Sequence, residues 1–287
     1  MTTEIGAFIH ALIEDTTPDG TLDFVMTYDH SAGAVKKVTP VNLGAVGGGI
    51  PISGWIVAAA MTYAGADDPT YTATMVGDVS GTYGLGMRIK LTQATGGTKY
   101  FIITKIAVAG DTTLTLYGGT DYNLEAEAIT DPYYALVKTP FGFPLDPTKW
   151  TVESTDVTQR SQASPATGTW YNLNGDSITI PIGVWRVSYQ VDIAADRSSA
   201  AGVTQVQAAL STANNSASDA DLVCEARVTA DSTSYWIASW TFYREKFLAL
   251  TTKTVYYLNS KAPSTADALY NLNAASELII RAVCAYL

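Results

Sequence analysis

The chain has 287 residues, enough for two or three domains of ordinary size, each with its own core. Charged residues make up only 15%, against about 25% in a typical soluble domain. The formal net charge is −10, and this excludes the basic surface that a phosphate backbone requires, so we expect no nucleic-acid partner. Hydrophobic residues reach 47% and aromatic residues 10%. Aromatic enrichment with charge depletion is typical of surfaces buried between subunits, although a Tyr-rich monomer core has the same composition.

Residues 1–49 form the first predicted segment. A short helical turn is expected at 6–14, and two strands at 24–28 and 35–38 are separated by a turn at 29–33. Such a ribbon is too small to bury itself, so we expect it to dock on a neighbouring protein. The glycine-rich run 44–49 is interpreted as a flexible linker. The candidate attachment residues are Phe24, Val25, Met26, Tyr28, Val35, Lys36, Lys37 and Val38.

Residues 50–147 are predicted to form a small β-domain. Alternating β-branched and aromatic residues at 70–76, 87–92, 99–104 and 112–117 indicate strands, and turns rich in Gly and Asp separate them. Pro140, Pro144 and Pro147 then fall within eight residues. Proline disfavours continued regular structure, so this extended stretch is predicted to be the domain boundary.

Residues 148–287 carry about nine strand-like runs separated by polar turns. Along 184–192 the chain alternates strictly: Trp185, Val187 and Tyr189 share one face with Val191, and polar residues share the other. So many strands without an intervening helix predict a jelly roll or β-sandwich. The predicted fold class is therefore all-β, and two separate strands are expected at 235–243 and 246–250.

Catalytic and cofactor chemistry find little support in the sequence. His10 and His30 have no neighbouring ligands at a metal-binding spacing, and no phosphate loop, nucleophile elbow or dinucleotide fingerprint occurs. Cys224 and Cys284 lie in alternating apolar runs and are predicted to be buried free thiols. We therefore expect no enzyme activity, no cofactor and no metal.

Sugar binding or cleavage would draw on paired carboxylates and on aromatic side chains that can stack on sugar rings. A polysaccharide depolymerase needs two carboxylates across a cleft, but Asp67/Asp68 and Asp219/Asp221 are more typical of turns. Trp236 and Trp240 share a strand face and are assigned to packing. Tyr171 and Tyr235, beside polar turns, are the candidate contacts for a host cell-surface glycan.

Targeting signals are not apparent. The N-terminus has no basic region followed by an apolar run, and no apolar stretch approaches the roughly 20 residues that span a bilayer. The expectation is synthesis in a cytoplasm without membrane insertion.

Two parts of the chain resemble phage appendage proteins. Residues 12–20, 25–29 and 33–38 look like the attachment segment of phage tail-fibre and head-fibre proteins. Residues 150–287, with the run 180–191 after a Ser-Ile-Thr strand, look like the trimeric jelly-roll heads related in shape to the C1q and tumour-necrosis-factor modules.

This resemblance implies a homotrimeric structural protein of a bacteriophage virion, made in the host bacterial cytoplasm. It implies attachment through the N-terminus to another virion protein of the capsid, neck or tail, with the C-terminal domain outward. The sequence shows no heptad or collagen shaft, so a short spike or a capsid decoration protein that stabilises the shell fits as well as a tail fibre.

Overall fold

The computed structural model describes residues 25–29, 34–38 and 51–287, except 174, 198–201, 231–235 and 275. Two compact units are present, Met1–Ile56 and Val57–Leu287. The described residues contain no α-helix; three short 3-10 helices accompany the strands, η1 (Ser80–Thr82), η2 (Pro147–Trp150) and η3 (Ala220–Leu222). The all-β prediction is confirmed. The helical turn predicted at 6–14 and the linker at 44–49 lie outside the described residues.

The predicted N-terminal ribbon is confirmed. Strands β1 (Val25–Asp29) and β2 (Ala34–Val38) pair antiparallel, with Val25 opposite Val38 and Tyr28 opposite Val35. They form a sheet of only two strands, which offers little apolar surface for burial within itself.

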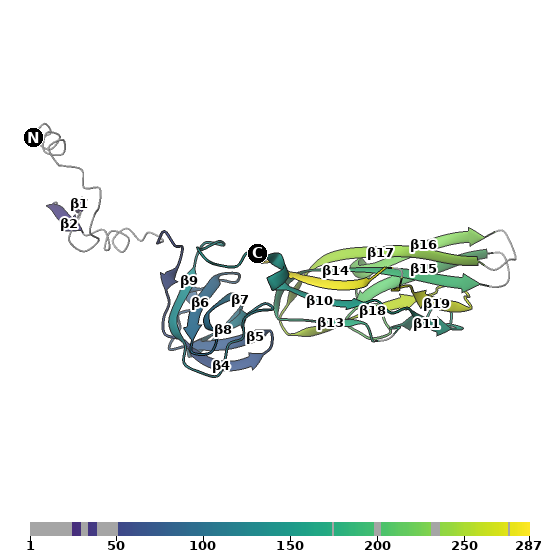
Figure 1. Cartoon of the computed structure of the whole chain (residues 1–287), viewed down its shortest axis with the longest axis horizontal. Coiled ribbons are helices and arrows are strands. Elements are labelled where there is room, and N and C mark those ends of the chain that lie inside the picture. Colours follow the sequence, from purple (N-terminus) through teal and green to yellow (C-terminus); the bar gives the residue numbers. More distant parts are fainter. Residues whose placement is uncertain are drawn as a thin grey trace, which may run out of the picture. The chain divides into compact units, whose positions relative to one another are not determined.

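One seven-stranded antiparallel sheet forms the middle domain (Figure 1), in the order β3-β9-β6-β7-β8-β5-β4. Its inward side chains, among them Phe101, Ile103, Leu114 and Leu116, form a single core. The strands are β3 (Ile56–Val57), β4 (Thr62–Asp67), β5 (Thr70–Met75), β6 (Arg88–Gln93), β7 (Gly97–Ala109), β8 (Asp111–Tyr117) and β9 (Thr130–Ala135).

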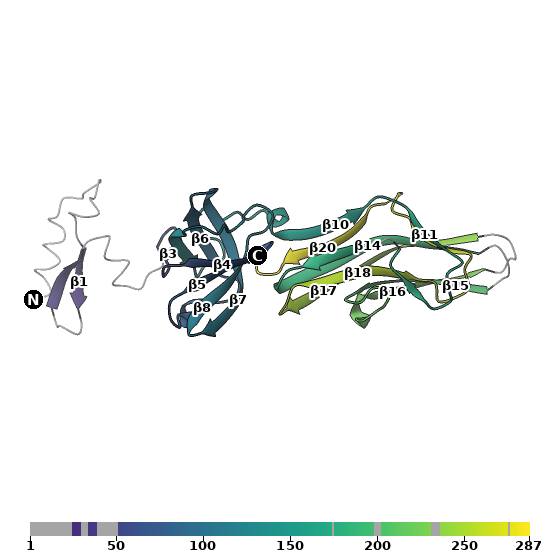
Figure 2. The same cartoon turned by 90° about the horizontal axis from the view of Figure 1, so that it is seen from below.

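The remaining strands form a two-sheet sandwich (Figure 2). They are β10 (Thr151–Asp156), β11 (Arg160–Ala163), β12 (Trp170–Tyr171), β13 (Ser177–Ile180), β14 (Gly183–Arg197), β15 (Gly202–Ser211), β16 (Val223–Ala230), β17 (Trp236–Leu250), β18 (Thr254–Lys261), β19 (Ala268–Asn271) and β20 (Leu278–Cys284).

The connections of the sandwich are those of a jelly roll. In the first sheet β14 pairs with β17 on one side and with β20 and β19 on the other, while β10 and β11 flank β20 and β19. In the second sheet β13 and β12 pair with β18, which is followed by β15 and β16. The chain crosses repeatedly between the sheets, and its first strand pairs with its last, as in a double Greek key.

Strand boundaries differ from the sequence prediction in two ways. Residues 235–243 and 246–250 do not form two strands, because β14 pairs with β17 without interruption over Gly183–Arg197. Strands β3, β4, β9, β11 and β19 were not predicted. Gly65 and Pro132 interrupt the expected pattern in β4 and β9, and the alternating apolar signal is weak in β11, whose sequence is RSQA.

The predicted alternation in β14 is confirmed. Trp185, Val187, Tyr189 and Val191 all point into the sandwich and are 0–1% exposed, whereas Arg186 lies on the opposite, solvent-facing side. Both cysteines are free and buried, as predicted.

A second apolar layer joins the middle domain to the sandwich, and we call it the domain seam. Ile102 and Tyr117 face outward from β7 and β8, yet both are fully buried. The Tyr117 ring lies 5.0 Å from the Trp185 ring and 5.9 Å from the Trp150 ring, and Phe143 stacks on Trp150 at 5.0 Å. The proline-rich stretch therefore contributes a packed side chain to the seam and is not a loose connector.

Arg88 fixes the polar edge of this seam. Its guanidinium is 1% exposed and donates to the carbonyl oxygens of Lys138, Gly86 and Tyr286 and lies 4.8 Å from the Phe143 ring centre. Burial lowers the pKa of Arg88 from its usual value. The contact with Tyr286 ties β6 of the middle domain to the end of the sandwich.

Candidate functional site

The structure places the backbone of the attachment residues but not their side chains. Met26 lies opposite Lys37, and Tyr28 opposite Val35, within the ribbon. Phe24 lies outside the described residues. The strand pairing brings residues 25–28 and 35–38 together, and their role in attachment stays a prediction.

The structure describes one of the two candidate glycan contacts, Tyr171. Tyr171 is half-buried on β12, and its hydroxyl accepts a hydrogen bond from the amide of Ala166 at 2.8 Å. The neighbouring Trp170 ring lies 4.4 Å from the ammonium of Lys261. Tyr235 lies outside the described residues.

The candidate carboxylate pairs serve structural contacts. Asp67 forms an ion pair with Lys253 at 2.7 Å and thereby links the β4–β5 turn to the sandwich. Asp219 and Asp221 both bind the ammonium of Lys246, at 2.7 and 2.8 Å. Each pair is thus bound by a lysine at a turn, which agrees with the prediction that these carboxylates belong to turns.

No metal-binding cluster is found among the described residues: they contain no group of three His, Cys, Asp or Glu side chains close enough to hold an ion. His10 and His30 lie outside the described part of the chain. No helix in the described part is both long and apolar enough to cross a membrane. Burial raises the pKa of the Cys284 thiol to about 11, which disfavours the reactive thiolate.

Sequence reasoning missed the most conspicuous exposed apolar residues of the sandwich. On β17, Tyr243 and Phe247 point away from the core and are 55% and 64% exposed. Phe247 lies opposite Arg186 of β14, which in turn lies opposite Val283 of β20. We call this outer side of β17, β14, β20 and β10 the open face; its members include Glu153, Arg186, Tyr243, Glu245, Phe247, Ile279, Arg281 and Val283.

Charges on the open face are balanced. Arg186 lies 3.8 Å from Glu245, and the Tyr243 hydroxyl donates to Glu245 at 2.8 Å. Arg281 of β20 pairs with Glu153 of β10 on the same side of the sheet. The open face thus combines aromatic rings with arginines of matched charge, the residue types that are enriched in protein interfaces.

The sequence contained a signal for this face that was not used. Along 241–250 the alternation places Tyr243 and Phe247 with Glu245, on the side opposite the core residues Phe242 and Leu248. Arg244 and Lys246 lie on the side of Phe242 and Leu248, so charge does not separate the two sides, but both sides carry an aromatic residue and only one side can face the core.

Sequence reasoning also missed the half-buried carboxyl of Asp176 in the sandwich. Burial, with the nearby Asp156 carboxylate, raises the pKa of Asp176 to about 6. Arg160 binds Asp156 at 3.2 Å, and this cation partly offsets the shift at Asp176. The carboxyl therefore titrates close to neutral pH.

Comparison with known proteins adds little to this geometry. No protein-family model matches the chain, and no curated protein is significantly similar to it. Among solved structures, the VP2 subviral particle of infectious bursal disease virus is 13% identical over 90% of this chain and 67% of that chain, with a TM-score of 0.25. The Gx strain of the same virus gives 13% identity over 90% and 68%, also with a TM-score of 0.25. These TM-scores are too low to support an argument about function.

Proposed function

We propose that this chain is a non-enzymatic structural protein of a bacteriophage particle that assembles as a homotrimer. In this proposal the N-terminal ribbon attaches to a capsid, neck or tail protein, and the jelly-roll sandwich points outward, toward host cell-surface glycans. The phage assignment rests on the resemblance of residues 12–38 and 150–287 to appendage proteins. The proposal of self-assembly rests on the open face.

The open face supports self-association because it differs from the rest of an acidic chain. The net charge of −10 makes two copies repel one another over most of their surface. On the open face two arginines and two glutamates pair with each other, so that repulsion is locally absent. Exposed Tyr243 and Phe247 then offer apolar area whose burial favours association.

Light scattering of the full chain tests this proposal. The expected mass is three times that of one chain at micromolar concentration, and Phe247→Glu is expected to shift it to a single chain with an unchanged near-ultraviolet circular dichroism spectrum. Val157→Glu is the matched control, since Val157 is also 64% exposed but lies in the β10–β11 loop. A wild-type monomer contradicts the proposal.

The attachment role of the ribbon has a separate test. Deletion of residues 1–49 is expected to abolish incorporation into particles and to leave the oligomeric mass unchanged, because Val57–Leu287 forms a compact unit of its own. Incorporation of the shortened chain would place attachment elsewhere.

Capsid decoration is a second candidate that one observation favours. The described residues form no α-helical shaft that would carry the sandwich away from a particle. Many copies of the protein on purified empty heads would establish this role over that of a tail fibre.

A further inference from the structure

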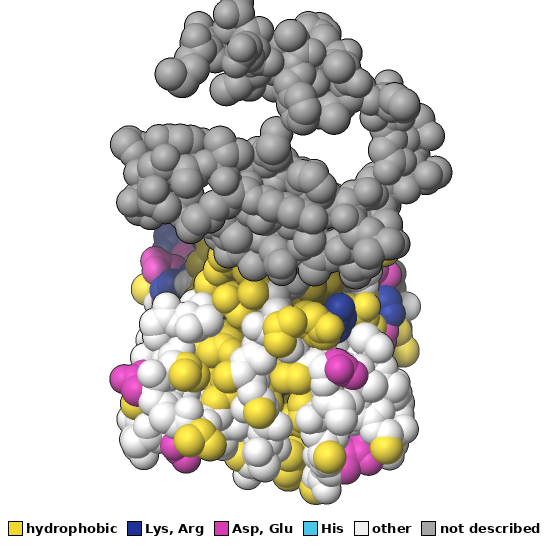
Figure 3. Space-filling model, turned by 90° about the vertical axis from the view of Figure 1, so that its left-hand side faces the viewer, with side chains coloured by type: hydrophobic (Ala, Val, Ile, Leu, Met, Phe, Trp, Pro, Cys, Tyr) yellow, Lys and Arg dark blue, Asp and Glu magenta, His cyan; other side chains and the backbone are white. Residues whose placement is uncertain are grey.

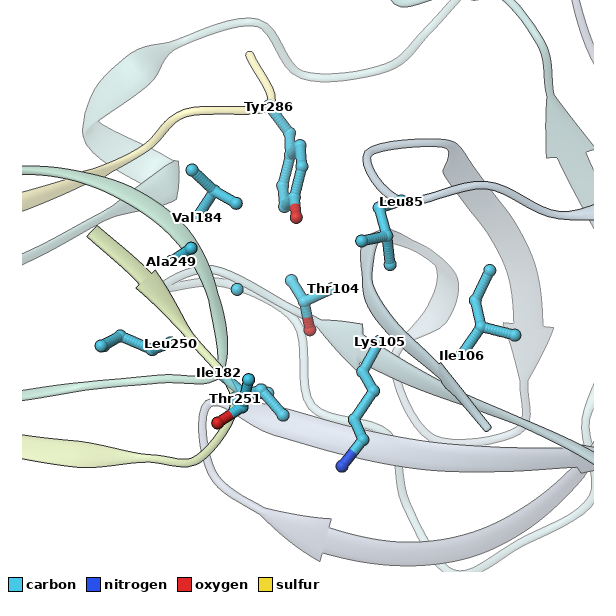
Figure 4. A pocket seen from close by; sticks show the side chains of 11 residues that line it. Leu85, Thr104, Lys105, Ile106, Ile182, Val184, Ala249, Leu250, Thr251 and Tyr286 are labelled. Atoms are coloured by element: carbon cyan, nitrogen blue, oxygen red, sulfur yellow. The ribbon is translucent and has the colours of Figure 1, made fainter. Parts of the chain in front are cut away.

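An apolar groove lies where the start of β14 and the end of β17 meet β7 of the middle domain (Figure 4). Its volume is about 350 Å³. Val184 and Ala249 line it from the sandwich, Leu85 and Ile106 line it from the middle domain, and the Tyr286 ring lies at one end. We call it the junction groove. Because both domains supply its walls, it exists only when the domain seam is intact.

The junction groove continues the open face. Ala249 follows Phe247 by two residues on β17, so both side chains lie on the same side of the strand. Val184 and Arg186 have the same relation on β14. Apolar surface therefore runs from Phe247 through the groove to Leu85, which is 56% exposed.

Charge distribution favours another copy of this chain as the occupant. Lys105 is the one charged residue lining the groove among the described residues, and the adjoining open face carries the balanced Arg186–Glu245 pair. The end of the middle domain turned away from the sandwich (Figure 3) shows hydrophobic side chains interspersed with carboxylates and with Lys or Arg side chains. A second acidic chain meets no excess of negative charge at the groove.

We propose that the junction groove is a contact between copies, filled by an apolar side chain of the neighbouring chain in the trimer. The middle domain is then part of the trimer interface and not a spacer outside it. This inference rests on the proposed homotrimer and deepens it, because it adds the second domain to the surface that assembles.

Two substitutions on opposite walls of the groove test this inference. Leu85→Glu and Ala249→Glu are each expected to raise the concentration at which the trimer dissociates by about tenfold or more, because each places a charge in an apolar contact. Val76→Glu is the matched control: Val76 is 89% exposed in the middle domain and lines neither the groove nor the open face. Dissociation is followed by light scattering over a dilution series, with circular dichroism as the check of folding.

A second measurement does not depend on a disruptive change. The variant Leu85→Cys places a thiol in the groove wall. Because the native cysteines are buried, the rate of labelling by a maleimide reagent reports the accessibility of this new thiol. Labelling is expected to be slow in the trimer and fast after dilution to monomers. Fast labelling at every concentration overturns the inference, and slow labelling at every concentration shows that the chain covers its own groove, which overturns it equally.

The outcomes separate the two proposals. If the wild-type protein is trimeric and the groove variants dissociate at the same concentration as the control Val76→Glu, the groove is not a contact and the homotrimer stands. If wild-type protein is monomeric, the homotrimer itself is wrong.

Discussion

Aromatic side chains gather in several regions of the described structure, and two of them, the domain seam and the open face, differ in their surroundings. At the domain seam, Tyr117, Trp150 and Trp185 are fully buried, and the indole N–H groups of both tryptophans donate to prolyl carbonyls at 2.8 Å. On the open face, Tyr243 and Phe247 are more than half exposed. The same enrichment in the sequence therefore reflects two separate uses, one inside a single chain and one at its surface.

This difference limits what composition can indicate. The aromatic share and the low charge predicted surfaces buried between subunits, yet much of the aromatic area is already covered within the chain at the seam. The aromatic area that stays exposed on the open face remains available for a partner. Stability and assembly should consequently respond to different substitutions.

The largest expected effect is at the seam. Trp185→Ala removes a fully buried ring that contacts Tyr117 and is expected to lower the free energy of unfolding by about 3 to 5 kcal/mol. Urea denaturation measures it at a protein concentration below that at which the proposed trimer dissociates, so that association does not contribute to the measured stability. Phe247→Ala is the control on the open face, with an expected change in monomer stability within about 0.5 kcal/mol. Similar losses at both positions would erase the distinction between the two regions.

Removal of the buried guanidinium is expected to have the next largest effect. Arg88→Met retains much of the packing volume but leaves the carbonyl groups of Lys138 and Tyr286 without their donor, which should cost about 1 to 3 kcal/mol. Differential scanning calorimetry of the variant measures the loss. A neutral result would mean that water replaces the guanidinium and that the polar edge of the seam is wet.

A buried carboxyl away from both aromatic regions gives a pH-dependent comparison. The pKa of Asp176 is raised to about 6 in the folded protein, from 3.8 for an ordinary aspartate. Protonation of Asp176 therefore stabilises the folded protein progressively as the pH falls from about 6 toward the lower pKa of the unfolded chain. Asp176→Asn is therefore expected to be more stable than wild type at pH 7.5, by on the order of 1 kcal/mol because solvent screens this half-buried group. The difference should shrink by pH 5. Parallel unfolding curves at the two pH values test this, and a constant difference would refute the burial effect.

The smallest expected effect concerns the exposed ion pair between Lys253 and Asp67. Lys253→Ala breaks the ion pair with Asp67, whose side chain is 63% exposed, so the expected loss is at most about 0.5 kcal/mol and decreases with added salt. Thermal unfolding at low and high salt measures it. A loss of stability comparable to that of Arg88→Met would show that the Lys253–Asp67 ion pair and the buried contacts of the seam act as one unit.

Sequence reasoning predicted the fold best where one strand face is buried and the other is wet. The alternation of Trp185, Val187 and Tyr189 with Arg186 and Ser188 was sufficient to orient β14. Strands β4 and β9 escaped prediction because Gly65 and Pro132 break that pattern, while neighbouring strands supply the pairing that local propensity does not.

The candidate surface was harder to predict for a different reason. Periodicity shows that a strand face is apolar, but not whether its own domain, the next domain or another chain covers it. Tyr117 and Trp185 are far apart in sequence and meet only through the fold. The sequence places aromatic residues on both sides of 241–250, and the structure shows that the side of Phe247 is the exposed one.

The length of β14 has a mechanical consequence. Gly183, at its first position, packs against Thr104 of the middle domain, and β14 then pairs with β17 through to Arg197. Hydrogen bonds in an antiparallel ladder run perpendicular to the strands, so a pull along the strand axis loads them in shear. All the bonds between β14 and β17 then resist together and do not open one after another. A tensile load applied across the seam along this axis would therefore meet the strongest direction of the sandwich.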